Sequence, residues 1–96
     1  MIDFAGYLMP VQFEGVVAEH ISVKKDVGVF DVSHMGEFYI HGDKAEEFLQ
    51  SVLSNDISIL KNGQAQYNCI PNESGGIVDD LILYKFEINR YMLVVN

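Results

Sequence analysis

The most restrictive feature of this sequence is a series of three β-rich runs in its second half, joined by very short connections. The connections contain Gly75-Gly76 and Asn89, residue types that favour tight turns. Connections this short join antiparallel neighbours, because a parallel pair needs a crossover of a dozen or more residues. The sequence therefore predicts an antiparallel meander, with strands over about residues 64–71, 77–86 and 90–96.

Two amphipathic patterns ahead of the meander predict helices. The first runs from Val16 to Val27, and Gly28 suits the position just past its end. The second follows Asp43, which begins an Asp-x-x-Glu variant of the capping box. Its buried stripe is expected to comprise Ala45, Phe48, Leu49, Val52 and Leu53. The predicted fold class is therefore α+β, with two helices packed on a mostly antiparallel sheet.

The remaining segments are short and weakly patterned. Residues 1–14 are expected to be irregular, since Gly6 and Pro10 interrupt them. Further extended pieces are expected at Val29–Val32, Glu37–His41 and Asn55–Leu60, with a turn at Asn62-Gly63.

Charge and hydropathy exclude two classes of function. Acidic residues outnumber basic ones by 14 to 6, which gives a formal net charge of −8, and the only adjacent basic pair is Lys24-Lys25. Nucleic-acid binding, which needs clusters of Lys and Arg, is therefore excluded as a main function. No apolar run approaches the roughly 20 residues of a membrane helix, and no signal-peptide pattern opens the chain. No membrane partner is expected.

The nucleophilic and metal-ligating residues show no constellation of their own. Cys69 is the only cysteine, so no internal disulfide and no cysteine-based zinc site is expected. The three histidines lack metal-ligand spacing, which predicts no metal site. Ser33 and His34 point apart if their segment is extended, so they are not expected to form a nucleophile and its base.

The adjacent carboxylates of Asp79 and Asp80 head an apolar strand, where aspartate is disfavoured. Alternation along the strand places Asp80 on the same face as Tyr84, while Asp79 points to the opposite face. The two carboxylates therefore need not form a dyad that shares one proton. Two interpretations stay open: Asp80 faces a ligand cavity, or both residues serve the turn at Gly75-Gly76.

Tyr67 extends the possible site to the preceding strand, where it shares a face with Cys69. If the two strands pair about the Gly-Gly turn, that face is continuous with the one that bears Asp80 and Tyr84. Two tyrosines beside a carboxylate would form a cradle for a flat, nitrogen-rich heterocycle, with stacking from the rings and hydrogen-bond acceptance from the acid. Ordinary packing of the same side chains is the alternative.

Five ordered sequence blocks extend over nearly the whole chain. They are Asp3–Pro10, Gly28–Glu37, Gln64–Tyr67, Asn72–Leu81 and Tyr91–Asn96. Together they resemble the aminomethyltransferase family, the T-proteins of the glycine cleavage system. Members of that family are several times longer, so the resemblance implies that residues 1–96 are an incomplete N-terminal portion of the folate-binding region. The apolar residues at both ends of the sequence also indicate that it is a piece of a longer protein.

The resemblance implies an enzyme that uses tetrahydrofolate as its co-substrate and the H-protein as its partner. The one-carbon unit of an aminomethyl group, carried on the lipoyl arm of the H-protein, passes to the folate with release of ammonia. The key acidic residue of the family falls on Asp80, where it orients the folate and helps a ring nitrogen attack the aminomethyl carbon. The implied folate-pocket positions are Met35, Tyr67, Asp80, Tyr84 and Asn96.

Two further expectations follow from the resemblance. The rest of the family's pocket comes from later sequence, so the 96 residues alone are expected to be inactive. The implied location is the cytoplasm, or the mitochondrion if the source is eukaryotic.

Three other interpretations compete with this one. The first is a folate-binding protein of the same superfamily that serves iron–sulfur assembly without transferring a group. The second is the folate module of a dimethylglycine or sarcosine dehydrogenase, and the third is a general α+β interaction module. The Asp79-Asp80-Leu81 and Ser33–Gly36 blocks favour the aminomethyltransferase.

Overall fold

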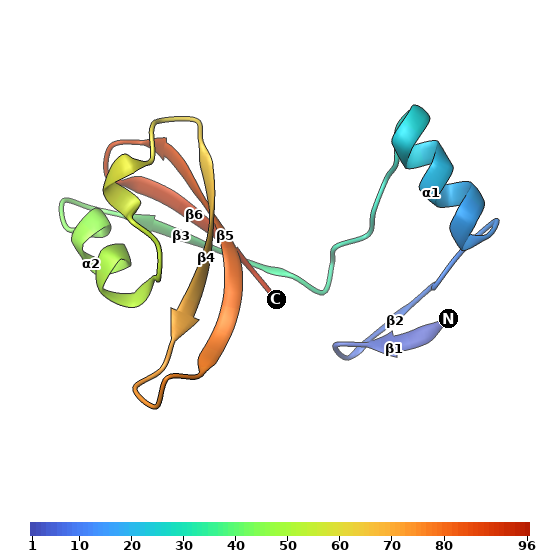
Figure 1. Cartoon of the computed structure of the whole chain (residues 1–96), viewed down its shortest axis with the longest axis horizontal. Helices are drawn as coiled ribbons and strands as arrows, with labels where there is room; N and C mark the ends of the chain where they lie inside the picture. Colours follow the sequence, from blue (N-terminus) through green and yellow to red (C-terminus); the bar gives the residue numbers. More distant parts are fainter. The chain divides into compact units, whose positions relative to one another are not determined.

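The computed structural model describes the whole chain, Met1 to Asn96, which divides into two compact units. The first unit comprises Met1–His34 and the second comprises Met35–Asn96. Figure 1 labels the helices and strands of both units. All the residues expected in the folate pocket belong to the second unit.

The second unit is built on a four-stranded antiparallel sheet with the strand order β3-β6-β5-β4 (Figure 1). The strands are β3 (Gly36–His41), β4 (Ala65–Pro71), β5 (Ile77–Glu87) and β6 (Arg90–Val95). β4, β5 and β6 form the predicted meander, and their ends lie within one residue of the expected ones. β3 comes earlier in the chain and pairs with β6. The predicted α+β class with antiparallel pairing is confirmed.

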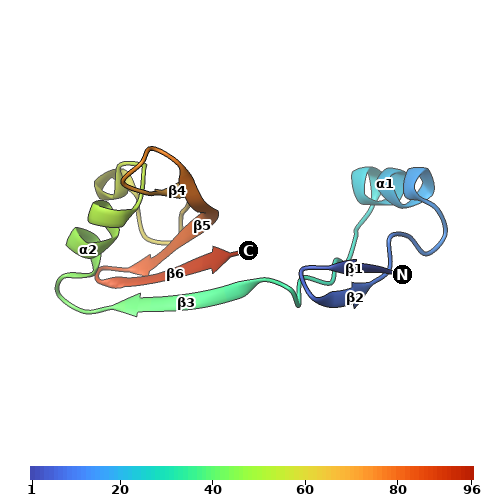
Figure 2. The same ribbon diagram turned by 90° about the horizontal axis from the view of Figure 1, so that it is seen from below.

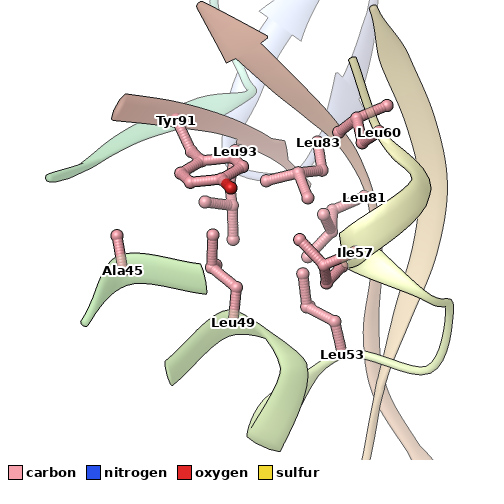
Figure 3. Packing of buried hydrophobic residues seen from close by; sticks show 9 residues of the cluster. All are labelled: Ala45, Leu49, Leu53, Ile57, Leu60, Leu81, Leu83, Tyr91 and Leu93. Carbon is pink, nitrogen blue, oxygen red and sulfur yellow. The ribbon is translucent and has the colours of Figure 1, made fainter. Parts of the chain in front are cut away.

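One face of this sheet packs against helix α2 (Ala45–Val52) and the short 3-10 helix η1 (Ile57–Ile59) (Figure 2). Figure 3 shows the core, in which side chains from these helices meet side chains from β5 and β6. Its buried members are Ala45, Leu49, Leu53, Ile57, Leu60, Leu81, Leu83, Tyr91 and Leu93. Each fully buried leucine contributes about 1.5–3 kcal/mol to stability, so this cluster holds β5 and β6 in place.

The capping box expected at Asp43 is not formed. α2 begins at Ala45, its N-cap residue is Lys44, and no side chain caps it. Gly42 adopts a φ of 127°, and its carbonyl accepts a hydrogen bond from the Ala45 N–H at 3.0 Å. The chain therefore enters the helix through a backbone turn, which leaves Asp43 outside the cap position.

The buried stripe of α2 is narrower than the sequence predicts. Ala45, Leu49 and Leu53 are buried, whereas the Phe48 side chain is 52% exposed. Residues four apart lie one above another on a helix. These three therefore face the sheet, and Phe48 lies outside the core that they form.

The extended piece expected over Asn55–Leu60 is wrong, because this segment contains η1. Asp56 is the N-cap of η1, and its carboxylate accepts hydrogen bonds from the N–H of Ser58 at 3.0 Å and from the hydroxyl of Ser58. The Gln50 amide oxygen of α2 also accepts a bond from the Ile57 N–H at 2.8 Å. These side-chain acceptors satisfy N–H groups that an extended strand would direct to a neighbour.

The first unit contains a hairpin where the sequence predicted irregular chain. β1 (Ile2–Phe4) pairs with β2 (Tyr7–Met9) through a two-residue turn at Ala5 and Gly6. Both turn residues have positive φ, 52° and 82°, and a two-residue hairpin turn of the type I′ form needs positive φ at both positions. Gly6 is therefore a turn residue rather than a break between irregular segments.

Helix α1 (Val16–Lys25) confirms the first predicted helix, although it ends two residues earlier and buries none of its residues. The Glu19 carboxylate accepts the N–H groups of Phe13, Glu14 and Gly15, and these hydrogen bonds hold the pKa of Glu19 below its usual value. Neither α1 nor α2 has the length and the apolar character to span a bilayer.

The segment after α1 is not a strand. Val29–Val32 does not pair with any strand, and the Val29 side chain is 97% exposed. Gly28 does not have the positive φ of a left-handed helix cap. A Cβ at this position would lie 2.5 Å from Cγ2 of Val23. The glycine allows the chain to pass close to the helix it has just left.

Candidate functional site

The predicted pairing of β4 with β5 brings four candidate residues to one face of the sheet. Cys69 lies opposite Asp80, and Tyr67 lies one pair further along, opposite Ile82. Directly opposed residues project to the same side of a sheet. Leu81 and Leu83 are buried in the core, so Asp80 and Tyr84 point away from it. We call the surface formed by Tyr67, Cys69, Asp80 and Tyr84 the open face.

Asp80 is the centre of the contacts on the open face. The Tyr67 hydroxyl donates a hydrogen bond to Oδ2 of Asp80 at 2.8 Å, from the neighbouring strand. The Asn96 side-chain amide donates to Oδ1 of Asp80 at 2.9 Å. One carboxylate thus receives a donor on each oxygen, from β4 and from the residue that follows β6, while the side chain stays half-buried.

Asp79 also accepts hydrogen bonds from Asn96, although alternation along the strand places it on the face opposite Asp80. Its Oδ1 accepts from the Asn96 side-chain nitrogen at 3.0 Å, and its Oδ2 accepts from the Asn96 backbone N–H at 3.1 Å. These bonds, the side-chain one first, hold the pKa of Asp79 below its usual value, against a smaller opposing effect of burial. The two aspartates leave the strand on opposite sides and yet share one bridging residue.

Met35 and Tyr84 lie at different distances from this centre. Met35 directly precedes β3, next to the pair formed by Gly36 and Val95, so continuing the register places it beside Asn96. Tyr84 shares the face of Asp80 but lies four residues along the strand, about 13 Å away at the usual rise per residue. Among the predicted residues, direct hydrogen bonds therefore join Asp80 to Tyr67 and Asn96.

Two hollows of the surface lie away from this centre. The larger is lined by acidic and polar residues of α2 and the neighbouring loops, among them Asp43, Glu46, Glu47 and Asp56. The second lies beside η1 and the start of β4. Neither hollow is lined by Asp80 or Tyr84. No group of three or more His, Cys, Asp or Glu side chains is arranged to hold a metal ion.

The Ser33-His34 pair does not form a nucleophilic site. The Ser33 N–H donates to the Asp31 carboxylate at 2.9 Å, and the His34 ring lies edge-on against the Phe4 ring at 5.0 Å. His34 Nδ1 is buried without a hydrogen-bond partner. The histidine therefore packs within the first unit rather than activating the serine.

The Tyr67–Asp80 hydrogen bond predicts a shifted titration. The hydrogen bond is the largest cause of a rise in the pKa of Tyr67 from 10.0 to about 12; desolvation of the phenol and the charge of the nearby carboxylate add to it. Between these values the unfolded chain loses the phenol proton while the folded chain keeps it. This stabilisation is thus complete below pH 10 and is lost as the pH rises toward 12. In Asp80→Asn, the pKa of Tyr67, read from the pH dependence of a ring-carbon NMR signal, should return toward 10. An unchanged pKa would contradict the hydrogen bond.

The fold defines a class of protein when it is compared with solved structures. A crystal structure of the glycine cleavage system aminomethyltransferase T from Bartonella henselae superimposes with a TM-score of 0.84 and 42% sequence identity. The match covers 97% of this chain and 26% of that chain. The chain therefore has the fold of the corresponding part of a glycine cleavage T-protein.

Sequence comparisons identify the family itself. The family described as the GCVT N-terminal domain matches residues 1–96, and this chain belongs to it. Curated relatives named aminomethyltransferase include those of Flavobacterium psychrophilum, 64% identical, and Phocaeicola vulgatus, 57% identical, each over all of this chain. The chain spans 27% of the length of these two relatives. The comparisons confirm the resemblance to aminomethyltransferases and do not favour the iron–sulfur or dehydrogenase alternatives.

Proposed function

We propose that this chain is the N-terminal portion of the folate-binding region of an aminomethyltransferase of the glycine cleavage system. The full-length enzyme transfers the one-carbon unit of the aminomethyl group on the lipoyl arm of the H-protein to tetrahydrofolate. The products are 5,10-methylenetetrahydrofolate, ammonia and the dihydrolipoyl arm. The relatives named above support this activity, and since they are bacterial, we place the enzyme in a bacterial cytoplasm.

The observation that carries the proposal is the Asp80 carboxylate, which is held from both sides on the open face. Each carboxylate oxygen has two lone pairs, and Tyr67 and Asn96 occupy one on each oxygen. The remaining lone pairs accept N–H groups of a bound pterin, so that Asp80 orients the folate and assists proton transfer at the attacking nitrogen. In this proposal Asp80 is the catalytic residue.

The neighbouring side chains suit a flat heterocycle. The Tyr67 ring is 58% exposed on the open face and Tyr84 is 37% exposed, so both rings have surface for stacking. Met35 adds a polarizable thioether beside Asn96. We assign Met35, Tyr67, Asp80, Tyr84 and Asn96 as the folate-binding residues that this portion contributes.

Cys69 provides a direct test of where the folate binds. It is the chain's only cysteine, it lies opposite Asp80 in the sheet, and it is half-buried. In the full-length enzyme, saturating tetrahydrofolate is expected to slow iodoacetamide labelling of Cys69 by roughly tenfold, because a ligand on Asp80 covers the thiol. Mass spectrometry of the peptide that contains Cys69 measures the rate.

Two comparisons complete this test. Asp80→Asn should remove the protection while leaving labelling without folate unchanged. Ammonia release from aminomethyl-lipoyl H-protein, dependent on tetrahydrofolate, separates a transferase from a protein that only binds folate. Labelling of Cys69 that is insensitive to tetrahydrofolate would place the folate elsewhere and overturn the proposed site.

A further inference from the structure

The Asn96 side-chain amide lies between the two aspartates and bonds to both. Its nitrogen donates to Oδ1 of Asp79 at 3.0 Å, to Oδ1 of Asp80 at 2.9 Å and to the carbonyl of Asp80 at 3.1 Å. A primary amide has two N–H bonds, so these three acceptors share two hydrogens. Which acceptors the two N–H bonds reach therefore depends on the orientation in which the Asn96 side chain is held.

Asp79 is the group that holds Asn96 at two points. One carboxylate oxygen accepts from the backbone N–H of Asn96 at 3.1 Å, and the other accepts from its side chain. Asn96 directly follows β6, one position past the pair of Leu81 with Val95. An asparagine side chain samples several rotamers unless a partner selects one.

The Asp79 carboxylate is suited to this role by its charge. Hydrogen bonds to an ionised acceptor are roughly twice as strong as those between neutral groups. The Asn96 bonds hold the pKa of Asp79 below its usual value, so the carboxylate is ionised at neutral pH. The Asp80 N–H also donates to Oδ1 of Asp79 at 3.0 Å, which ties the backbone of the two aspartates together.

We propose that Asp79 is a positioning residue for the reaction: its carboxylate fixes Asn96, and the Asn96 amide fixes Oδ1 of Asp80. Tyr67 fixes Oδ2 from the other side. Asp79 itself points away from the open face, and its effect on the Asp80 carboxylate passes through Asn96. The inference rests on the proposed function, in which Asp80 is the group that meets the folate.

The kinetic test uses the full-length enzyme with Asp79→Asn, Asn96→Ala and both changes together. Asp79→Asn leaves one acceptor in place of two, and we expect kcat to fall about tenfold, because small misplacements of a catalytic group carry costs of this order. The KM for tetrahydrofolate should change less than kcat, since Asp79 does not touch the folate and the Asn96 side chain is still present. The double variant should be no slower than Asn96→Ala alone, because residues that act in series are not additive.

Asp43→Asn is the matched control for the loss of one negative charge. Asp43 is exposed and lies outside the site, so this variant should keep the activity of the parent. If the losses from Asp79→Asn and Asn96→Ala multiply in the double variant, Asp79 acts on Asp80 by another route and the proposal is overturned. A loss of equal size in Asp43→Asn would assign the effect to net charge and would also overturn it.

Hydrogen exchange provides a second measurement that does not depend on activity. In Asp79→Asn, the backbone amide of Asn96 should exchange at least about tenfold faster, because its acceptor is weakened. The amide of Leu83, in the centre of β5, should not change. Unchanged exchange at Asn96 overturns the inference whatever the activity. A fully active Asp80→Asn would instead overturn the proposed function, so the two failures are distinguishable.

Discussion

In the full-length enzyme, Asp80→Asn is expected to lower the rate of tetrahydrofolate-dependent aminomethyl transfer by roughly 10²- to 10⁴-fold, the usual contribution of a general acid or base. Asparagine has nearly the same shape, but it is uncharged, and one of its two terminal atoms is a donor. Either the Tyr67 hydroxyl, at 2.8 Å, or the Asn96 amide, at 2.9 Å, then loses its acceptor. The loss should appear in kcat, measured as ammonia release with aminomethyl-lipoyl H-protein.

Asp79→Asn is the matched comparison, because it makes the same chemical change one residue earlier. Its loss should be about tenfold, since it displaces the Asp80 carboxylate without removing it. Both aspartates lie outside the buried cluster, so the circular dichroism of the two variants should match that of the parent. Equal losses in the two variants would contradict the assignment of Asp80 as the residue that meets the folate.

The strands and their faces could be predicted because they depend on local signals. Short turns between the β-rich runs left only antiparallel pairing, and alternation then assigned Asp80 and Tyr84 to one face. The register that brings Tyr67 to Asp80 could not be predicted from such local signals. It is set by the hairpin between β4 and β5 and by an irregularity between Ile70 and Pro71, where the pairing shifts.

The bridge at Asn96 could not be predicted from alternation. Alternation along β5 places Asp79 on the core side of the strand. This position comes before Leu81, the first residue of β5 that pairs with β6, and lies next to Asn96. Its carboxylate therefore reaches Asn96 instead of entering the core. The one signal available in the sequence was the cost of an aspartate on the core side, which demands a polar partner.

The error over 55–60 has its cause in side chains that bind the backbone. Asn68 is almost fully buried, and its amide oxygen accepts the Asn55 N–H at 2.9 Å. Gln50 donates to the Asn55 carbonyl at 2.8 Å and accepts from the Ile57 N–H. These bonds join α2, β4 and η1 across residues far apart in the sequence. Local propensity carries no information about such partners.

Leu49→Ala is expected to destabilise the second unit by about 2–5 kcal/mol, the usual cost of removing a buried leucine side chain. Leu49 is 0% exposed, and it lies in the cluster with Leu83 and Tyr91 of β5 and β6 (Figure 3). Whole domains are stable by only about 5–15 kcal/mol, so this change removes a large share. Urea unfolding of the chain measures it as a lower midpoint at an unchanged m-value.

Phe48→Ala is the control for Leu49→Ala, because it removes a larger side chain from the adjacent position of the same helix. Both changes create alanine, so helix propensity favours neither strongly. Phe48 is 52% exposed and lies outside the buried cluster, so its loss should cost less than about 1 kcal/mol. Were Phe48→Ala the more damaging of the two, α2 would be rotated so that the wider stripe predicted by the sequence packs on the sheet. β5, which carries Asp80 on one face and Leu83 on the other, would then be held by different contacts.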